Sequence, residues 1–166
     1  MKILRIAAKA ILGIGLATAI VVAIPSVASA NEVEPRAKLS HSQATAKFRD
    51  AGITWSSSGN CSDRNNPTCT SFEQIRSETV AGVITLKSAS GCAIRLTGGT
   101  ETGHASGTYS HWNGYKVDFA LSTCLNNYIQ RFTYIGGSKW KSGSGNIYYK
   151  EGNHWDVLYY NCGGCR

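Results

Sequence analysis

Apolar residues recur at helical spacing in two segments of the chain. Residues 40–51 place Ala44 and Phe48 on one face behind a serine cap, which predicts a short helix. A second periodic run follows, with its apolar side chains at Phe72, Ile75, Val80, Val83 and Leu86. Thr70 precedes this run and has an acid three residues later, as in a capping box. We therefore predict that the main helix covers residues 71–88.

Polar and apolar residues alternate in the second half of the chain, which is typical of half-buried strands. The predicted strands cover residues 92–97, 115–121, 126–135, 146–150 and 154–160, and the third and fourth form a hairpin. Residues 98–114 are rich in glycine and predict a long loop. One main helix packed on a small antiparallel sheet is an α+β fold.

The first 30 residues have the parts of a secretory signal: a basic start, an apolar run over 10–24 and a small-residue exit ending at Ala30. An uncleaved anchor is the alternative, but the run is short for a membrane span. We expect cleavage after Ala30, a flexible tail over 31–39 and a single domain over 40–166. The product would be secreted or associated with the cell wall, or periplasmic where the host has an outer membrane, without stable membrane insertion.

Charge and cysteine content agree with export. The full chain has a net charge of +7, of which three positive charges lie in the first 30 residues, so the cleaved protein would carry a mild +4 that suits anionic cell-wall polymers. No basic run with interleaved aromatics points to nucleic acid. Six cysteines, all after residue 60, predict three disulfides that staple the fold. We favour Cys61–Cys69, since the polar loop between them is short. A four-cysteine zinc site or a redox pair is the alternative, and both need reduced thiols.

Two short motifs carry the candidate chemistry. Asp118 follows His111 by seven residues, and a Gly-Asn turn separates Glu151 from His154, so that both can face one cleft. Two imidazoles and a carboxylate are the ligands of a catalytic zinc site with one open position. A nearby glutamate would act as general base, so these residues fit amide hydrolysis.

The motifs Ser110-His111-x-x-Gly114-x-x-x-Asp118 and Glu151-x-x-His154-Trp155 resemble those of the zinc D-Ala-D-Ala carboxypeptidase and L-alanyl-D-glutamate endopeptidase family. This resemblance implies a hedgehog-like fold, one Zn²⁺ held by His111, Asp118 and His154, and Glu151 as catalytic base. It also implies peptidoglycan or a short peptide as substrate. The family's substrate-binding arginine has no counterpart in residues 97–104, with Arg95 nearest, which favours an endopeptidase over a strict carboxypeptidase.

Four further residues are candidates for substrate binding or for orienting a ligand. Glu101 and His104 lie in the glycine-rich loop before the first ligand, where simple loop hydrogen bonding is the alternative. Lys116 shares the polar face of its strand with Asp118, and it either binds a peptide carboxylate or is solvated. Trp155 either contacts substrate or packs the cleft wall.

The sequence therefore predicts a monomeric, secreted zinc metallopeptidase that acts on peptidoglycan stem peptides. An exported, non-catalytic zinc-binding module, for instance a wall-binding or toxin-like protein on the same fold, is the first alternative. A metal-free, disulfide-rich inhibitor or lectin is the second.

Overall fold

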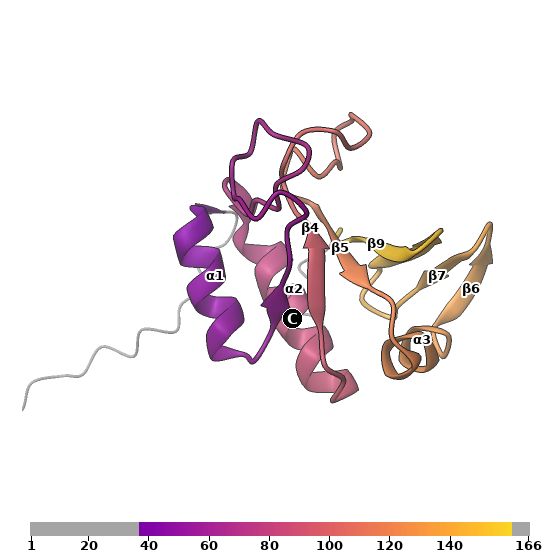
Figure 1. Ribbon diagram of the computed structural model, residues 1–166. Helices are drawn as coiled ribbons and strands as arrows, with labels where there is room; N and C mark the ends of the chain where they lie inside the picture. Colours follow the sequence, from indigo (N-terminus) through magenta and orange to yellow (C-terminus); the bar gives the residue numbers. More distant parts are fainter. Residues whose placement is uncertain (1–36, 161–166) are drawn as a thin grey trace, which may run out of the picture. The chain divides into compact units, whose positions relative to one another are not determined.

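The computed structural model describes residues 37–160, which form a mixed α/β fold (Figure 1). Its helices are α1 (His41–Asp50), α2 (Ser77–Ser90) and α3 (Thr123–Ile129). The strands are β1 (Lys38–Leu39), β2 (Thr54–Trp55), β3 (Ile75–Arg76), β4 (Arg95–Gly98), β5 (Lys116–Ala120), β6 (Thr133–Gly136), β7 (Lys139–Lys141), β8 (Ile147–Glu151) and β9 (His154–Leu158). The α+β prediction is confirmed at this level, with three helices among the described residues instead of one main helix.

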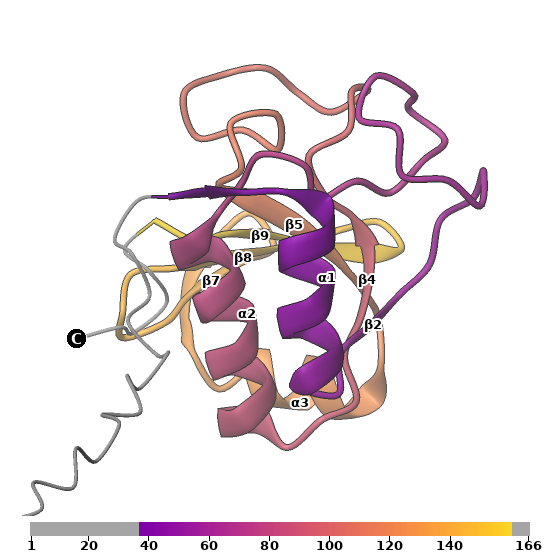
Figure 2. The ribbon, with the colours of Figure 1, turned by 90° about the vertical axis from the view of Figure 1, so that its left-hand side faces the viewer.

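Seven strands form one sheet in the order β2-β4-β5-β9-β8-β7-β6, and β1 pairs with β3 separately. Every pairing in the large sheet is antiparallel except that of β2 with β4. Helices α1 and α2 lie side by side across one face of this sheet (Figure 2). The opposite face of the sheet is the one that carries Asp118.

The predicted first helix is confirmed. The Ser40 hydroxyl accepts a hydrogen bond from the Gln43 amide, and the Gln43 side chain accepts one from the Ser40 amide, which completes a capping box. Ala44 and Phe48 are fully buried on one face, as the spacing predicts.

The predicted start of the main helix is wrong, because α2 begins at Ser77 and not at residue 71. Gln74 has φ +64°, which no helix continues through, and the next two residues pair with β1. The Thr70 hydroxyl does not cap a helix but lies within hydrogen-bond distance of the carbonyls of Ser56, at 2.9 Å, and Thr97, at 3.2 Å. Phe72 and Ile75 are buried, as expected, but they reach the core from a turn and a strand.

The predicted hairpin of 126–135 with 146–150 is also wrong. Residues 123–129 form α3, with Leu125 and Ile129 buried one helical turn apart. β7 lies inside the expected turn and pairs with both β6 and β8. Alternation alone did not reveal a third strand of only three residues.

The other predicted strands hold with shifted ends, because β4, β5 and β9 lie in or overlap residues 92–97, 115–121 and 154–160. The expected loose tail is corrected at its end, since Lys38–Leu39 is a paired strand. The signal peptide, the rest of the tail and two cysteines, Cys162 and Cys165, lie outside the described residues.

Residues 37–160 contain two disulfides. Cys61–Cys69 closes the polar loop, as predicted, and Cys92–Cys124 joins the segment after α2 to α3. Disulfides fit an extracellular protein. Within residues 37–160, no helix has the length and apolar character needed to cross a membrane.

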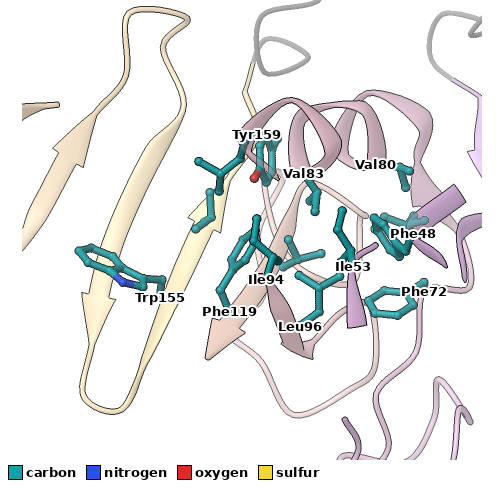
Figure 3. Close-up of a cluster of buried hydrophobic side chains, with 14 of the residues drawn as sticks. Phe48, Ile53, Phe72, Val80, Val83, Ile94, Leu96, Phe119, Trp155 and Tyr159 are labelled. Atoms are coloured by element: carbon teal, nitrogen blue, oxygen red, sulfur yellow. The ribbon is translucent and has the colours of Figure 1, made fainter. Parts of the chain in front are cut away.

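The core lies between the helices and one face of the sheet (Figure 3). On β5, Val117 and Phe119 point into this core and are fully buried. Because side chains alternate along a strand, Lys116 and Asp118 point to the opposite face. The core thereby fixes which face of the sheet carries the polar side chains.

Candidate metal centre

Asp118 is the centre of a polar cluster on the sheet face away from the core. It lies in the middle of β5, paired with Gly98 on β4 and Asp156 on β9, and is only 7% exposed. A Cβ atom on Gly98 would lie 2.3 Å from Asp118 Oδ2. The strand position opposite the carboxylate therefore has room only for glycine.

His111 lies in the loop before β5 and is also buried. Its Nδ1 is 2.7 Å from the carbonyl oxygen of Gly99, and a carbonyl can only accept, so Nδ1 carries the hydrogen. In the neutral ring Nε2 then presents a lone pair, 3.3 Å from Asp118 Oδ1. Two acceptors face each other at this point, and either a proton or a cation between them would resolve the contact.

The other two site histidines are anchored in the same way. His104 donates from Nε2 to Glu101 Oε1 at 3.2 Å, which leaves Nδ1 at 3.8 Å from Asp118 Oδ2. His154 donates from Nδ1 to the side-chain oxygen of Asn153, which leaves Nε2 at 3.7 Å from Asp118 Oδ1. Each imidazole thus has one nitrogen fixed by a partner and the other directed toward the same carboxylate.

His104, His111 and Asp118 could hold a metal ion, because their ligand atoms lie within 4.8 Å of one another. The rings of His104 and His111 stack with centroids 3.8 Å apart. Asp118 Oδ1 is buried without a hydrogen bond, which is rare for a buried polar atom and fits a bound cation. From the sequence, His104 is predicted only to orient a ligand or to contact substrate, so its place among the possible metal ligands was missed. Its position in the loop beside the predicted ligands was the available signal.

The Gly-Asn turn brings Glu151 beside His154, as predicted. Gly152, with φ +56°, turns the chain so that the two residues pair across the β8–β9 hairpin. Glu151 Oε2 is 3.9 Å from His154 Nε2, and the Glu151 side chain is half exposed. The carboxylate therefore lies at the rim of the cluster and remains accessible to solvent.

Glu101 is a buried carboxylate behind the histidines. Its oxygens accept hydrogen bonds from the amides of Ser71 at 2.7 Å and Gly99 at 3.0 Å, besides the bond to His104. These contacts tie the glycine-rich loop to the segment before α2. Glu101 thus positions His104, and the Gly99 carbonyl that it helps to fix positions His111.

The last two residues predicted to contact substrate or orient a ligand, Lys116 and Trp155, have different surroundings. Lys116 is paired with Asp156 at 2.7 Å, and Asp156 Oδ2 is also 3.9 Å from His111 Nε2. Asp156 was not among the site residues predicted from the sequence. Trp155 is fully buried, and its indole nitrogen donates to Asn126, so the suggested substrate contact is wrong. Successive side chains on a strand point to opposite faces of the sheet. Trp155 therefore points into the core, while Asp156, the next residue on β9, points to the site.

The cluster has the electrostatics of a cation site. Burial raises the pKa of Asp118, but the neighbouring imidazoles of His111, His154 and His104, which favour the carboxylate when they are protonated, outweigh it and hold the pKa below its usual value. Burial lowers the pKa of His104, but Glu101, Asp118 and Asp156 outweigh it and raise that pKa. The carboxylates therefore favour positive charge at this point.

A cleft of about 440 Å³ opens beside the cluster. Its lining residues are Arg95, Thr97, Asp118, Ala120, Leu121, Asn153 and His154. A guanidinium group thus shares this cleft with Asp118 and His154. A peptide lying in the cleft would have access to both.

Comparison of the chain with protein-family models, curated proteins and solved structures gives no match. The function must be inferred from the site itself.

Proposed function

We propose that this protein is an exported zinc metallopeptidase that cleaves peptide bonds in peptidoglycan stem peptides. The observation that carries the proposal is the common orientation of three imidazoles, each with one anchored nitrogen and a free nitrogen directed at Asp118. Such anchoring is the usual arrangement around metal-binding histidines.

The residues fit a zinc ion. Asp118 Oδ1 lacks a hydrogen bond and faces His111 Nε2, so a cation between them would satisfy both atoms. Imidazole nitrogens and a carboxylate oxygen are ligands that zinc accepts in catalytic sites. We assign His111, Asp118 and His154 as the ligands of the active form, with His104 beside them.

Bound zinc would polarise the scissile carbonyl and lower the pKa of a water molecule. Glu151, exposed at the rim beside His154, would accept the proton of the attacking water and return it to the leaving nitrogen. Arg95 on the cleft wall would bind a substrate carboxylate. Glu101 would hold the His104 ring in place through the whole reaction.

The spacing of the two motifs, which resembles that of the D-Ala-D-Ala carboxypeptidase and L-alanyl-D-glutamate endopeptidase family, supports peptidoglycan as the substrate. The net charge of +4 that remains after removal of the first 30 residues, together with the disulfides, suits an exported protein that works on an anionic wall. We therefore also propose the hedgehog-like fold that this family implies.

A non-catalytic zinc-binding module is the second candidate, and one observation favours it. With His104, the candidate ligands number four, the other three being His111, Asp118 and His154, and four protein ligands are typical of closed, structural zinc sites. In that form no position would remain for water.

Mass spectrometry of peptidoglycan fragments separates the two candidates. The zinc-loaded protein should release fragments whose masses identify the cleaved bond, and a chelator should abolish the release. Glu151→Gln should lower the rate about a hundredfold or more while zinc content stays the same. Asp50→Asn, which removes an exposed carboxylate at the end of α1, should change neither. Zinc binding without any release would favour the non-catalytic module.

A further inference from the structure

The face of the sheet that carries Asp118 continues well beyond the metal centre. Asp118 pairs with Asp156 on β9, Asp156 with Tyr149 on β8, and Tyr149 with Lys139 on β7. Directly paired residues project to the same face of a sheet. These four side chains therefore form one row that runs across β5, β9, β8 and β7.

The far end of this row is positively charged. No acidic residue occurs between 119 and 150, a stretch that contains Arg131, Lys139, Lys141 and Lys150. Lys139 and Lys141 alternate with Trp140 on β7, so both ammonium groups belong to the site face. The sheet face thus changes from carboxylates at the metal centre to cations at β7.

Lys139 is available for a ligand. Its side chain is exposed, and its ammonium group lies 5.1 Å from the centre of the half-buried Tyr149 ring, which holds it by a cation–π contact. Among residues 37–160, no carboxylate forms an ion pair with Lys139. Lys116, by contrast, is neutralised by Asp156.

We propose that Lys139, positioned on Tyr149, is a subsite for a carboxylate of the peptide substrate. Three strand spacings separate it from Asp118, or about 14 Å at about 4.8 Å per spacing. An extended peptide covers that distance in about four residues. The carboxylate therefore lies about four residues from the scissile bond. This inference rests on the proposed function for the identity of the substrate, but the binding itself does not require turnover.

The test measures binding of a fluorescently labelled stem peptide, L-Ala-γ-D-Glu-L-Lys-D-Ala-D-Ala, to the zinc-loaded Glu151→Gln protein by fluorescence anisotropy. Amides of the D-Glu α-carboxylate, of the C-terminal carboxylate and of both are the comparison ligands. Lys139→Gln is the test variant, and Lys139→Arg retains the charge. Lys47→Gln, at an exposed lysine on α1, is the matched control.

We expect Lys139→Gln to weaken binding of the unmodified peptide about threefold, the range of a solvent-exposed ion pair. The C-terminal monoamide should bind wild type and Lys139→Gln equally, because only the C-terminal carboxylate can lie about four residues from a scissile bond, here the bond between L-Ala and D-Glu. Lys139→Arg and Lys47→Gln should bind as the parent does, and 1 M salt should remove the difference.

The proposal is overturned if no form of the peptide binds, if all four forms bind alike, or if Lys139→Gln and Lys47→Gln have the same effect. Its failure is distinguishable from failure of the peptidase proposal. A Lys139-dependent preference without hydrolysis by the wild type would leave the subsite standing and remove the enzyme. Hydrolysis by the wild type without a Lys139-dependent preference would support the peptidase proposal and overturn the subsite.

Discussion

Gly98→Ala tests whether the packing of β4 against β5 sets the metal centre. The new Cβ atom would lie 2.3 Å from Oδ2 and 3.0 Å from Cγ of Asp118. Real Cβ atoms do not approach so closely, so the Asp118 side chain must rotate or the strands must separate. Either movement takes Asp118 Oδ1 away from His111 Nε2, now 3.3 Å distant.

Two magnitudes follow. Overpacking of this kind costs about 1–3 kcal/mol of the free energy of unfolding. Displacing a ligand from its fixed orientation lowers metal affinity about 10- to 100-fold. Zinc affinity is measured by competition with a chromogenic chelator, and stability by urea denaturation of the metal-free protein.

Gly143→Ala is the matched control, because its new Cβ would meet no atom within 4 Å and its backbone is not left-handed. It should leave both quantities unchanged. If Gly98→Ala binds zinc as tightly as the wild type, Asp118 is not a ligand held by this contact. A Gly98→Ala protein that is less stable but retains full zinc affinity would equally show that this contact does not set the position of a metal ligand.

Three further predictions concern the same site and the staples of the fold. His104→Ala should lower zinc affinity, measured by metal competition, if His104 binds the metal. The chelator-sensitive release of fragments should persist in this variant if His111, Asp118 and His154 are sufficient ligands. Because the pKa of His104 is raised, its contribution to the stability of the metal-free protein is present below about pH 6.5 and is lost as pH rises through the raised pKa. Zinc affinity depends on pH in the opposite sense, because protons compete with the metal for the imidazole nitrogens. The increase in melting temperature caused by zinc should therefore grow from about pH 5.5 to about pH 8. A zinc effect that does not change with pH would contradict histidine ligation. Replacing both cysteines of Cys92–Cys124 by serine should lower the free energy of unfolding by about 3.7 kcal/mol, and the same change at Cys61–Cys69 by about 2.5 kcal/mol. The difference arises because Cys92–Cys124 closes a loop of 32 residues and Cys61–Cys69 one of 8. Denaturant unfolding of the two variants measures both losses.

The features that the sequence predicted are local. The capping box of α1, the alternation along β5 and the short Cys61–Cys69 loop depend on residues close together in the chain. So does the Gly-Asn turn that brings Glu151 to His154. Local geometry sets these features, and a periodic pattern or a turn sequence reports local geometry directly.

The tertiary structure decided the features that depend on distant segments. Helix α2 begins six residues late because the segment before it pairs with β1, and that partner is invisible to helical periodicity. Trp155 is in the core and Asp156 in the site because pairing with β5 sets which face of β9 is buried.

The metal centre itself combines both kinds of information. The sequence placed His111, Asp118 and His154 in motifs of suitable spacing, but His104 joins them only because Glu101 ties the glycine-rich loop to the segment before α2. Such a hydrogen bond has no fixed spacing in the chain. The residue types and local turns were therefore readable from the sequence, while the set of side chains around Asp118 depended on how distant strands and loops pack together.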